Sequence, residues 1–560
     1  MSNTFLKNIS FSFSTMLRLL VALLFAIAFY LNYNLAYVDD IYAAADKIFF
    51  YPKTTRAFAY SFIVFIVVFL GITAFHTVSS KIKISYNPVA RTPEKRDYLL
   101  WVIVFILLIC AWLPYILSYF PGGVYPDTAT CIGQARSGAY NNQQPLLYTM
   151  LFKICIIIAG ELHAVMLFSI LQIIFMAACF SYILYRLNLH DVNKFVLVLV
   201  LLYFALFNLI PLYVVSLWKD SLFSVALLMY IFKLTESVLL SKDAPERLEI
   251  VQIIIWMVLS MFLRNNGIYV MILTSVILSL VYGKSLLKDY KVFFISTFAA
   301  LILTYIVQGP VFSKLNLNGP FVENLGVLQQ QVAYVQVIGG DMTEEQAEFL
   351  NKVMPLETMK GFYRPFVVDT IKWCDQYNNE FLEENKGEFL KVWAGMLKEN
   401  PKLYMDAYLY ITLGYWNPFK QSEVSYINPQ MWPDLVEVDR YWQKDVIRDM
   451  TGNSIRENLY PKTLYSSALF LFITLILFTL SVNKKDKSWL AFVPALATYL
   501  TVFLATPLAF ALRYVYIVEL YRYLLLFHSF SVQTPRLGRL TKLLNIAVWH
   551  KGVYSGHFMT

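Results

Sequence analysis

The stretch YLLWVIVFILLICAWLPYILSY, residues 98–119, runs without a charged residue and decides the fold class. A helix needs about 20 mostly apolar residues to cross a bilayer, and this stretch is long enough. Similar runs elsewhere in the chain predict an all-α polytopic membrane protein with about twelve transmembrane helices. The predicted spans cover residues 13–33, 57–77, 98–119, 163–185, 195–216, 221–238, 249–263, 267–283, 291–308, 462–483, 488–507 and 511–529.

The overall composition agrees with this class. Hydrophobic residues make up 58% of the 560 residues and charged residues 15%, whereas a soluble domain carries about 25% charged residues. These values exclude a soluble globule, a disordered chain and a coiled coil. The net charge of +9 comes from basic residues between the apolar runs, and they form no patch of the kind that binds nucleic acid. We therefore expect membrane lipids, and no nucleic acid, as partners.

The basic residues also predict the topology, because cytoplasmic loops are enriched in Lys and Arg. With the N-terminus in the cytoplasm, the basic loops and the basic C-terminal tail all fall inside. A further span at residues 146–159 would spoil this agreement, so we expect an amphipathic helix at the outer interface there. The prediction is a multi-pass protein of the cell membrane with both termini cytoplasmic. The basic loop residues are Lys81, Lys83, Arg91, Lys95, Arg96, Arg186, Lys194, Lys242, Arg247, Lys284, Lys288, Lys291, Lys484, Lys485 and Lys487.

The segment 309–461 contains no apolar run long enough to cross the membrane, but it carries signals for helices. Thr343 and Gln346 have the spacing of a capping box. Asn400 followed by Pro401 predicts the start of another helix, and residues 380–397 have apolar side chains at helical spacing. We expect a mainly helical extracytoplasmic domain.

The outer loop 120–162 is the most informative stretch for function. It begins FPGGVYPDTAT, so that Pro and Gly fix the backbone directly after a span and hold Asp127 at the outer face. A carboxylate in that position can accept a proton from a hydroxyl nucleophile, or hold a divalent cation such as Mg²⁺ or Mn²⁺. Alternatively, Asp127 caps a short helix that starts at Thr128.

Three further turns place cations on the same predicted side. They carry Lys219 with Asp220, Arg264 with Asn265, and Arg513. Ionisable residues at membrane depth are costly and usually face a cavity or a partner, and such cations suit a phosphate. The alternatives are a mutual Lys219–Asp220 ion pair with a helix cap, and arginines that extend to the interface. A cavity lined by the three cations would suit a lipid-linked phosphate.

Other catalytic signatures are missing from the sequence. The six histidines do not pair at metal-ligand spacing. Walker A, G-x-G-x-x-G and G-x-S-x-G motifs are also absent, so nucleotide-driven transport and serine hydrolysis have no signal.

At this point the sequence resembles the GT-C glycosyltransferases, polytopic enzymes that use polyprenyl-phosphate-linked sugars. Tyr125-Pro126-Asp127 is similar to the acidic position of their first outer loop. Gln144-Pro145-Leu146-Leu147-Tyr148 is similar to the entry of an interfacial helix, with Gln144 where His is frequent. Lys219-Asp220 and Arg513-Tyr514 resemble a basic–acidic turn and a late Arg-Tyr pair.

A closer resemblance is to an uncharacterised bacterial group of large membrane proteins, and it covers roughly residues 98–530. Its motifs are Trp-Lys-Asp and Arg-Asn-Asn-Gly turns, a Gln-rich helix, and segments that match Leu328–Gln331, Tyr363–Pro365, Asp369–Lys372, Pro401–Tyr404 and Gly414–Pro418. The resemblance implies a two-helix N-terminal addition at 1–97 and a GT-C-like membrane core at 98–308. The outer domain at 309–461, C-terminal membrane helices at 462–529 and a basic cytoplasmic tail at 530–560 follow.

The resemblance implies transfer of a sugar, with inversion, from a polyprenyl-phosphate donor to a cell-envelope glycan or glycolipid at the extracytoplasmic face. Asp127 would be the general base, and Lys219, Arg264 and Arg513 would bind the donor phosphate. No cofactor is required by this chemistry, although a divalent cation such as Mg²⁺ or Mn²⁺ stays open. The expected substrate-binding residues are Asp220, Gln134, Gln144, Tyr148, Asn265, Gln330, Tyr363 and Trp416.

Rival functions share this architecture. They are a lipid-linked oligosaccharide flippase or other transporter, a glycan polymerase or ligase, and a non-catalytic scaffold. A transporter typically has repeated halves with broken helices, and the sequence predicts neither.

Overall fold

The computed structural model describes residues 13–51, 54–82, 84–241, 243–420, 443–459, 466–482, 487–523 and 531–533. Most of them are helical, and the few strands are two or three residues long. Within these described ranges, eight helices are long and apolar enough to cross a membrane, so the chain is a helical membrane protein. These eight cover Phe13–Tyr33, Thr55–Ser79, Lys95–Ser118, Ala164–Leu189, Lys219–Leu239, Gly267–Leu287, Lys291–Lys314 and Ser488–Ala505. The predicted tail 530–560 lies almost entirely outside the described residues.

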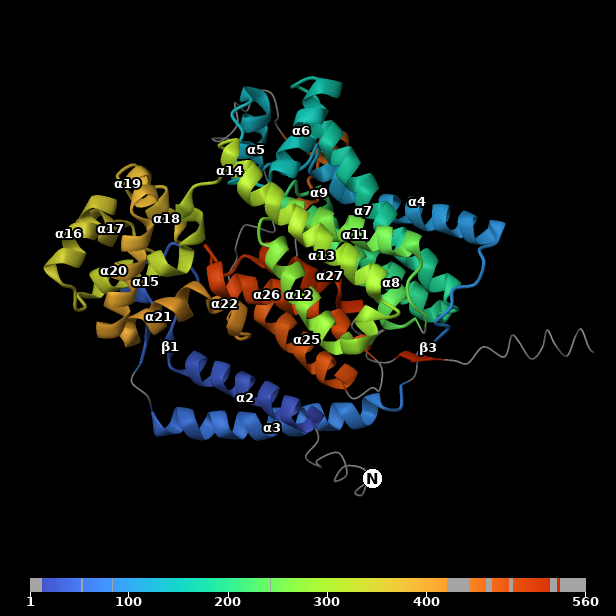
Figure 1. The fold of residues 1–560 in the computed structure, drawn as a ribbon, viewed down its shortest axis with the longest axis horizontal. Coiled ribbons are helices and arrows are strands. Elements are labelled where there is room, and N and C mark those ends of the chain that lie inside the picture. The colour runs from blue at the N-terminus through green and yellow to red at the C-terminus, as the bar shows by residue number, and fades with distance from the viewer. Residues whose placement is uncertain are drawn as a thin grey trace, which may run out of the picture.

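The elements follow one another as a bundle, an inserted helical segment and a return to the bundle (Figure 1). The first part holds α2 (Phe13–Tyr33), α3 (Thr55–Ser79), α4 (Lys95–Ser118), α5 (Pro126–Ser137), α6 (Leu146–Ala159), α7 (Ala164–Leu189), α8 (Lys194–Leu206), α9 (Leu209–Val215), α10 (Lys219–Leu234), α11 (Arg247–Leu263), α12 (Gly267–Tyr282), α13 (Lys291–Ile306) and α14 (Phe312–Lys314). The return holds α25 (Ser467–Val482), α26 (Val493–Ala505) and α27 (Tyr516–Leu520).

The inserted segment is helical, as the sequence predicts. Residues 326–411 of this segment gather beside the bundle, at the left of Figure 1. Thr343 and Gln346 form the expected capping box, whereas the helix expected over 380–397 is broken at Asn385. Its helices are α15 (Gly326–Ile338), α16 (Glu344–Val353), α17 (Leu356–Phe362), α18 (Asp369–Lys372), α19 (Asn379–Glu384), α20 (Lys386–Glu399), α21 (Pro401–Ile411), α22 (Leu413–Trp416), α23 (Val446–Thr451) and α24 (Arg456–Leu459).

Short strands tie distant parts of the chain together. β1 (Leu35–Ala36) pairs antiparallel with β2 (Phe49–Phe50), between α2 and α3. β3 (Ile84–Tyr86), just after α3, pairs parallel with β4 (Ser531–Gln533), which follows α27. The helices α2 and α3 lie side by side along one edge of the molecule (Figure 1).

The helix α10 is the centre of the bundle. Every residue from Asp220 to Leu239 is buried, including the π-helical turn Thr235–Leu239 that continues α10. α7, α11 and α27 pack around it, while the outer helices leave large apolar side chains exposed, as lipid-facing helices do. The polar residues at the two ends of α10 are therefore enclosed by protein.

One predicted span is broken. The run 195–216 forms α8 and α9, which meet at an angle of 51°. The break at Phe207 is explained by Pro211, because a proline ring clashes with the carbonyl group four residues earlier and cannot donate to it. The expectation that no helix is broken is therefore wrong for residues 195–216. The fully buried α9 leads directly into the turn that carries Lys219.

Candidate functional site

The loop before α5 and the turn before α10 are hydrogen-bonded to each other. Gly123 N–H donates to Val215 O at 2.8 Å, and Leu217 N–H donates to Gly123 O at 3.0 Å. Gly122 has φ +140°, and a Cβ there would lie 3.1 Å from Leu217 Cγ. Only glycine adopts that backbone readily. This pairing brings the start of α5 next to the start of α10, although they are far apart in the sequence.

Asp127 lies at the meeting point of two cations. Its Oδ2 accepts hydrogen bonds from Lys219 Nζ and Arg513 Nη1, both at 2.8 Å. Gln144 Nε2 donates to Asp127 Oδ1 at 3.3 Å, and Lys219 Nζ also donates to Gln144 Oε1. The structure therefore brings together four of the predicted residues. Asp127 lies in the first turn of α5, which starts at Pro126, so its side chain does not cap a helix that begins at Thr128.

Electrostatics keep Asp127 ionised. Burial alone would raise the pKa of Asp127, but the positive charges of Lys219 and Arg513 and their hydrogen bonds outweigh that effect. The result is a pKa well below the usual range for an aspartic acid. Ionised Asp127 is therefore a carboxylate between two cations. Its side chain keeps 26% of its surface exposed.

Aromatic rings position Arg513. Its guanidinium lies over the rings of Trp218 and Tyr514, 5.2 and 4.9 Å from their centroids, and Nη2 donates to Tyr514 OH at 3.0 Å. Trp218 is itself stacked on Tyr125 with centroids 3.9 Å apart. The sequence motifs Tyr-Pro-Asp and Trp-Lys-Asp contain Tyr125 and Trp218, but neither residue was among the predicted site residues.

The turn that carries Arg513 is fixed by α22. Gly414 N–H donates to Ala509 O at 2.9 Å, and a Cβ on Gly414 would lie only 2.4 Å from that oxygen. Tyr415 OH lies 2.9 Å from Leu508 O. The Gly-Tyr pair was part of a motif in the sequence, but its supporting role depends on a contact that the sequence does not reveal.

Arg264 and Asp220 form a buried pair behind the site. Their closest charged atoms are 3.3 Å apart, and Asp220 is completely buried. Arg264 Nη1 donates to Tyr514 O at 2.8 Å and its guanidinium lies over the Tyr514 ring. The alternative of a mutual Lys219–Asp220 ion pair is wrong, because Asp220 pairs with Arg264 and Lys219 with Asp127. Arg264 does not extend to the interface, since Asp220 and Tyr514 hold it inside.

Three further predicted residues shape the loop around Asp127. Gln134 Nε2 donates to Asn141 Oδ1 at 3.0 Å. Tyr148 OH donates to Leu217 O at 2.6 Å, and Asn265 Nδ2 donates to Asn142 O at 2.9 Å. Their hydrogen bonds hold loop segments to one another.

The predicted residues of the inserted segment bond within that segment. Gln330 Nε2 donates to Arg364 O at 2.8 Å, and Trp416 Nε1 donates to Leu409 O at 3.0 Å. The hydroxyl of Tyr363 is buried with no hydrogen-bond partner among the described residues. Gln143 Nε2 bonds Glu323 Oε1 at 3.2 Å and links the loop to this segment.

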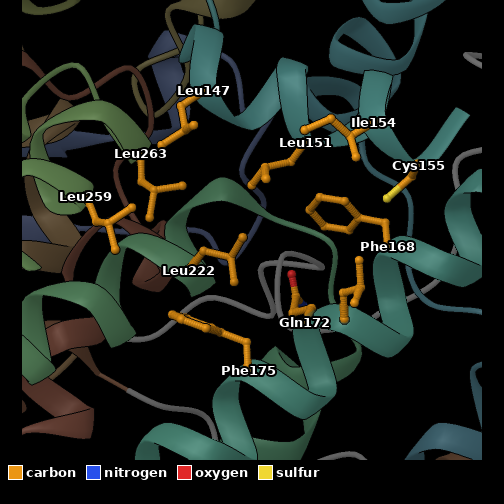
Figure 2. Close-up of a pocket in the computed structure, with 11 residues that line it drawn as sticks. Leu147, Leu151, Ile154, Cys155, Phe168, Gln172, Phe175, Leu222, Leu259 and Leu263 are labelled. Atoms are coloured by element: carbon orange, nitrogen blue, oxygen red, sulfur yellow. The ribbon is translucent and has the colours of Figure 1, made fainter. Parts of the chain in front are cut away.

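An apolar groove opens beside the site, with a cavity of about 280 Å³ between α6, α7, α10 and α11. Figure 2 shows aliphatic and aromatic side chains from these helices pointing into it. Its lining residues are Leu147, Leu151, Ile154, Cys155, Phe168, Leu171, Gln172, Phe175, Leu222, Leu259 and Leu263.

The groove starts where the polar site ends. On α10, Leu222 lies three positions after Lys219, on the same face of the helix. Leu147 follows Gln144 by three positions at the start of α6, and Leu263 directly precedes Arg264. The apolar lining of the groove therefore comes within one helical turn of Lys219 on α10.

No group of three or more His, Cys, Asp or Glu side chains with metal-ligand geometry occurs in the part of the chain that the structure describes.

Comparison with known proteins places the chain in a family but not in a functional class. No curated protein and no solved structure matches the chain. A family model described as a family of unknown function, DUF6020, matches residues 113–539, which include Asp127, Lys219, Arg264 and Arg513. The chain belongs to this family.

Proposed function

We propose that the protein is a GT-C-type membrane glycosyltransferase that transfers a sugar from a polyprenyl-phosphate donor to a cell-envelope glycan or glycolipid. The proposal includes about twelve spans, both termini in the cytoplasm, and the site with residues 309–461 at the extracytoplasmic face. The shorter apolar helices α11 and α25 and the bent pair α8–α9 would supply further crossings. The end of the last predicted span, residues 524–529, lies outside the described residues.

One observation carries the proposal: a carboxylate and two cations lie at the end of an apolar groove. Asp127 Oδ2 is 2.8 Å from both Lys219 Nζ and Arg513 Nη1. Cations of this kind suit the phosphate of a lipid-linked donor, and the groove suits its hydrocarbon chain. The combination therefore supports a substrate with an anionic head and a long apolar tail.

The reaction balances with these groups alone. The acceptor hydroxyl oxygen attacks the anomeric carbon, and the bond from that carbon to the phosphate oxygen breaks. The acceptor proton passes to Asp127, and the lipid phosphate leaves with the bonding electron pair. Lys219 and Arg513 stabilise the charge that develops on the leaving phosphate.

Donor binding would also activate the base. In the resting site Lys219 and Arg513 bind Asp127 and lower the pKa of its carboxyl group. A donor phosphate would compete for the same two cations. The pKa of Asp127 would then rise, because Lys219 and Arg513, which stabilise its ionised form, would be shared with the phosphate. The base would gain strength only when the donor is present.

A divalent cation at Asp127 fits these residues poorly. Two cationic side chains already bind the carboxylate, and a metal ion would meet their repulsion. The surroundings of Asp127 favour an anionic ligand.

The test is transfer by the purified protein. The wild-type protein, Asp127→Asn and the matched variant Asp375→Asn are each incubated with radiolabelled polyprenyl-phosphate sugars and cell-envelope glycan or glycolipid. Asp375 is exposed in the inserted segment. Loss of a general base typically costs about 10²–10⁴-fold in rate, so Asp127→Asn should lose at least about 100-fold, and Asp375→Asn should match the wild type.

The outcomes separate the rival functions. Full activity in a folded Asp127→Asn protein would refute the base. Movement of the lipid between leaflets without a product would identify a transporter, and transfer of a whole chain would identify a polymerase or ligase. If the wild-type protein neither transfers a sugar nor moves any of these lipids, a non-catalytic scaffold would be the remaining function.

A further inference from the structure

The apolar groove beside Asp127 continues along the bundle. A second cavity, of about 430 Å³, is also bounded by α7, α10 and α11, and Phe175 lines both. On α7 the lining residues of the two cavities follow one another at helical spacing, from Phe168 to Tyr182. The same holds on α10, from Leu222 to Lys233. The two cavities therefore lie one after the other along these helices, and we call them together the furrow.

The far end of the furrow holds a second charged cluster. Lys233 lines the second cavity, and its Nζ lies 2.5 Å from Glu236 Oε2. Arg186 Nε lies 2.5 Å from Glu236 Oε1. His190 Nε2 is 3.0 Å from the same oxygen, and its Nδ1 is 2.7 Å from Asn87 O. With an α-helical rise of about 1.5 Å per residue, Lys233 lies about 21 Å from Lys219 along α10.

The charges of this cluster do not balance. Glu236 is one carboxylate between two cations, Arg186 and Lys233. Among the other carboxylates, Asp97 pairs with Arg91 at 2.5 Å, and Glu249, which accepts from Ser237 at 2.9 Å, forms no ion pair with Arg186 or Lys233 within the described residues. Glu236 and Lys233 are almost completely buried. Positive charge in excess at the end of an apolar furrow favours an anion from the surrounding lipid.

We propose that this end of the furrow binds an anionic phospholipid, distinct from the lipid-linked substrate at Asp127. Its phosphate would lie at Lys233 and Arg186, and an acyl chain would follow Met229, Trp256 and Phe175 toward the middle of the bundle. Basic pockets between transmembrane helices bind phospholipid head groups in this way. This site does not depend on the function proposed for Asp127, because it uses other residues.

Native mass spectrometry of the delipidated full-length protein tests the site. The protein is offered equal amounts of phosphatidylglycerol and phosphatidylcholine. We expect phosphatidylglycerol to be retained about fivefold more, since one basic residue near a membrane surface contributes about that factor. Lys233→Gln should remove most of this preference. The matched variant Lys284→Gln, which removes an exposed lysine just after α12, should keep it.

Glu236→Gln should change the retention of phosphatidylglycerol in the opposite direction from Lys233→Gln. It removes the carboxylate that neutralises Lys233 and Arg186, so retention of phosphatidylglycerol should increase. A purely structural cluster would lose lipid in both variants. An addition of inorganic phosphate to the wild-type complex separates the sources: displacement of the lipid at millimolar phosphate would indicate a site for free phosphate.

The measurement on the wild-type protein tests the proposal by itself and does not depend on the folding of any variant. Equal retention of the two lipids by the wild-type protein would overturn the proposal. Equal loss in Lys233→Gln and Lys284→Gln, or a decrease in Glu236→Gln, would also overturn it.

Discussion

Asp127 and Arg513 are 386 residues apart in the chain, yet Arg513 Nη1 lies 2.8 Å from Asp127 Oδ2. The first of these residues follows α4 and the second precedes α27. Lys219, at the start of the buried α10, completes the contact. The site is thus assembled from three separate turns, and each can be altered independently.

Lys219→Gln should move the acidic limb of the kcat/KM profile to higher pH. In the wild type, the pKa of Asp127 lies below its usual value because two cations stabilise the carboxylate. The base and the stabilising ion pairs are therefore present above the pKa of an unfolded aspartic acid and are lost as pH falls through the lower, folded value. Removing one cation raises the folded pKa, so the loss begins at higher pH. The profile of kcat/KM reports the free enzyme. Lys360→Gln, an exposed change, should leave the limb in place, and an unshifted limb in Lys219→Gln would contradict the assignment.

Arg513→Lys should lower kcat/KM by about tenfold even though the charge is kept. The guanidinium bonds Asp127 and Tyr514 OH with different nitrogens and lies over two rings. An ammonium group cannot reproduce that planar geometry, and lost contacts of this kind cost about 1–2 kcal/mol. Arg448→Lys, at a largely exposed pair with Asp449, is the matched control and should lose little. Equal activity of both variants would show that position 513 needs only a positive charge.

Gly414→Ala should destabilise the protein and reduce transfer. The added methyl group would meet Ala509 O at 2.4 Å and push away the turn that leads to Arg513. Overpacking of this kind costs about 1–3 kcal/mol. Gly387→Ala, where the new Cβ would have nothing within 4 Å, should be tolerated. Thermal unfolding in detergent, measured beside transfer activity, distinguishes the two, and identical behaviour would mean that the contact yields without cost.

Lys372→Met should destabilise the inserted segment by about 3 kcal/mol. Lys372 Nζ lies 2.7 Å from Glu323 Oε2 and 2.9 Å from Asp369 Oδ1, and only 4% of the lysine side chain is exposed. Burial alone would lower the pKa of Lys372, but the two carboxylates raise it and keep the lysine charged. Its removal leaves two acids unpaired, which costs about 3–5 kcal/mol at fully buried pairs. Lys391→Met breaks only an exposed pair with Glu388. A similar melting temperature for both variants would disprove the role of Lys372.

The sequence predicted the residues of the charged site better than their partners. Composition and apolar runs predict a helical membrane protein, and loop signals select Asp127, Lys219 and Arg513. The pairing of Arg264 with Asp220 was not foreseeable, because it depends on how α10 and α11 pack. Trp218 was part of a motif but was given no role, because an aromatic residue beside a span is typical of any membrane interface.

The broken span and Gly414 show which features of the fold the local sequence can predict and which depend on tertiary contacts. Hydropathy treats residues 195–216 as one apolar run, although Pro211 within it is a local signal for the break. Gly414 illustrates the other case. Its small size matters only because Ala509 packs against it, and no local pattern in α22 reveals that neighbour.

The long separation between Asp127 and Arg513 has a consequence for biosynthesis. A ribosome that has produced only the first half of the chain has delivered the acid and Lys219, but not the guanidinium. The nascent protein is therefore without its second cation until nearly all of its helices have entered the bilayer. A chain cut short by a nonsense codon between positions 264 and 513 would retain the furrow and lack a finished head-group cradle.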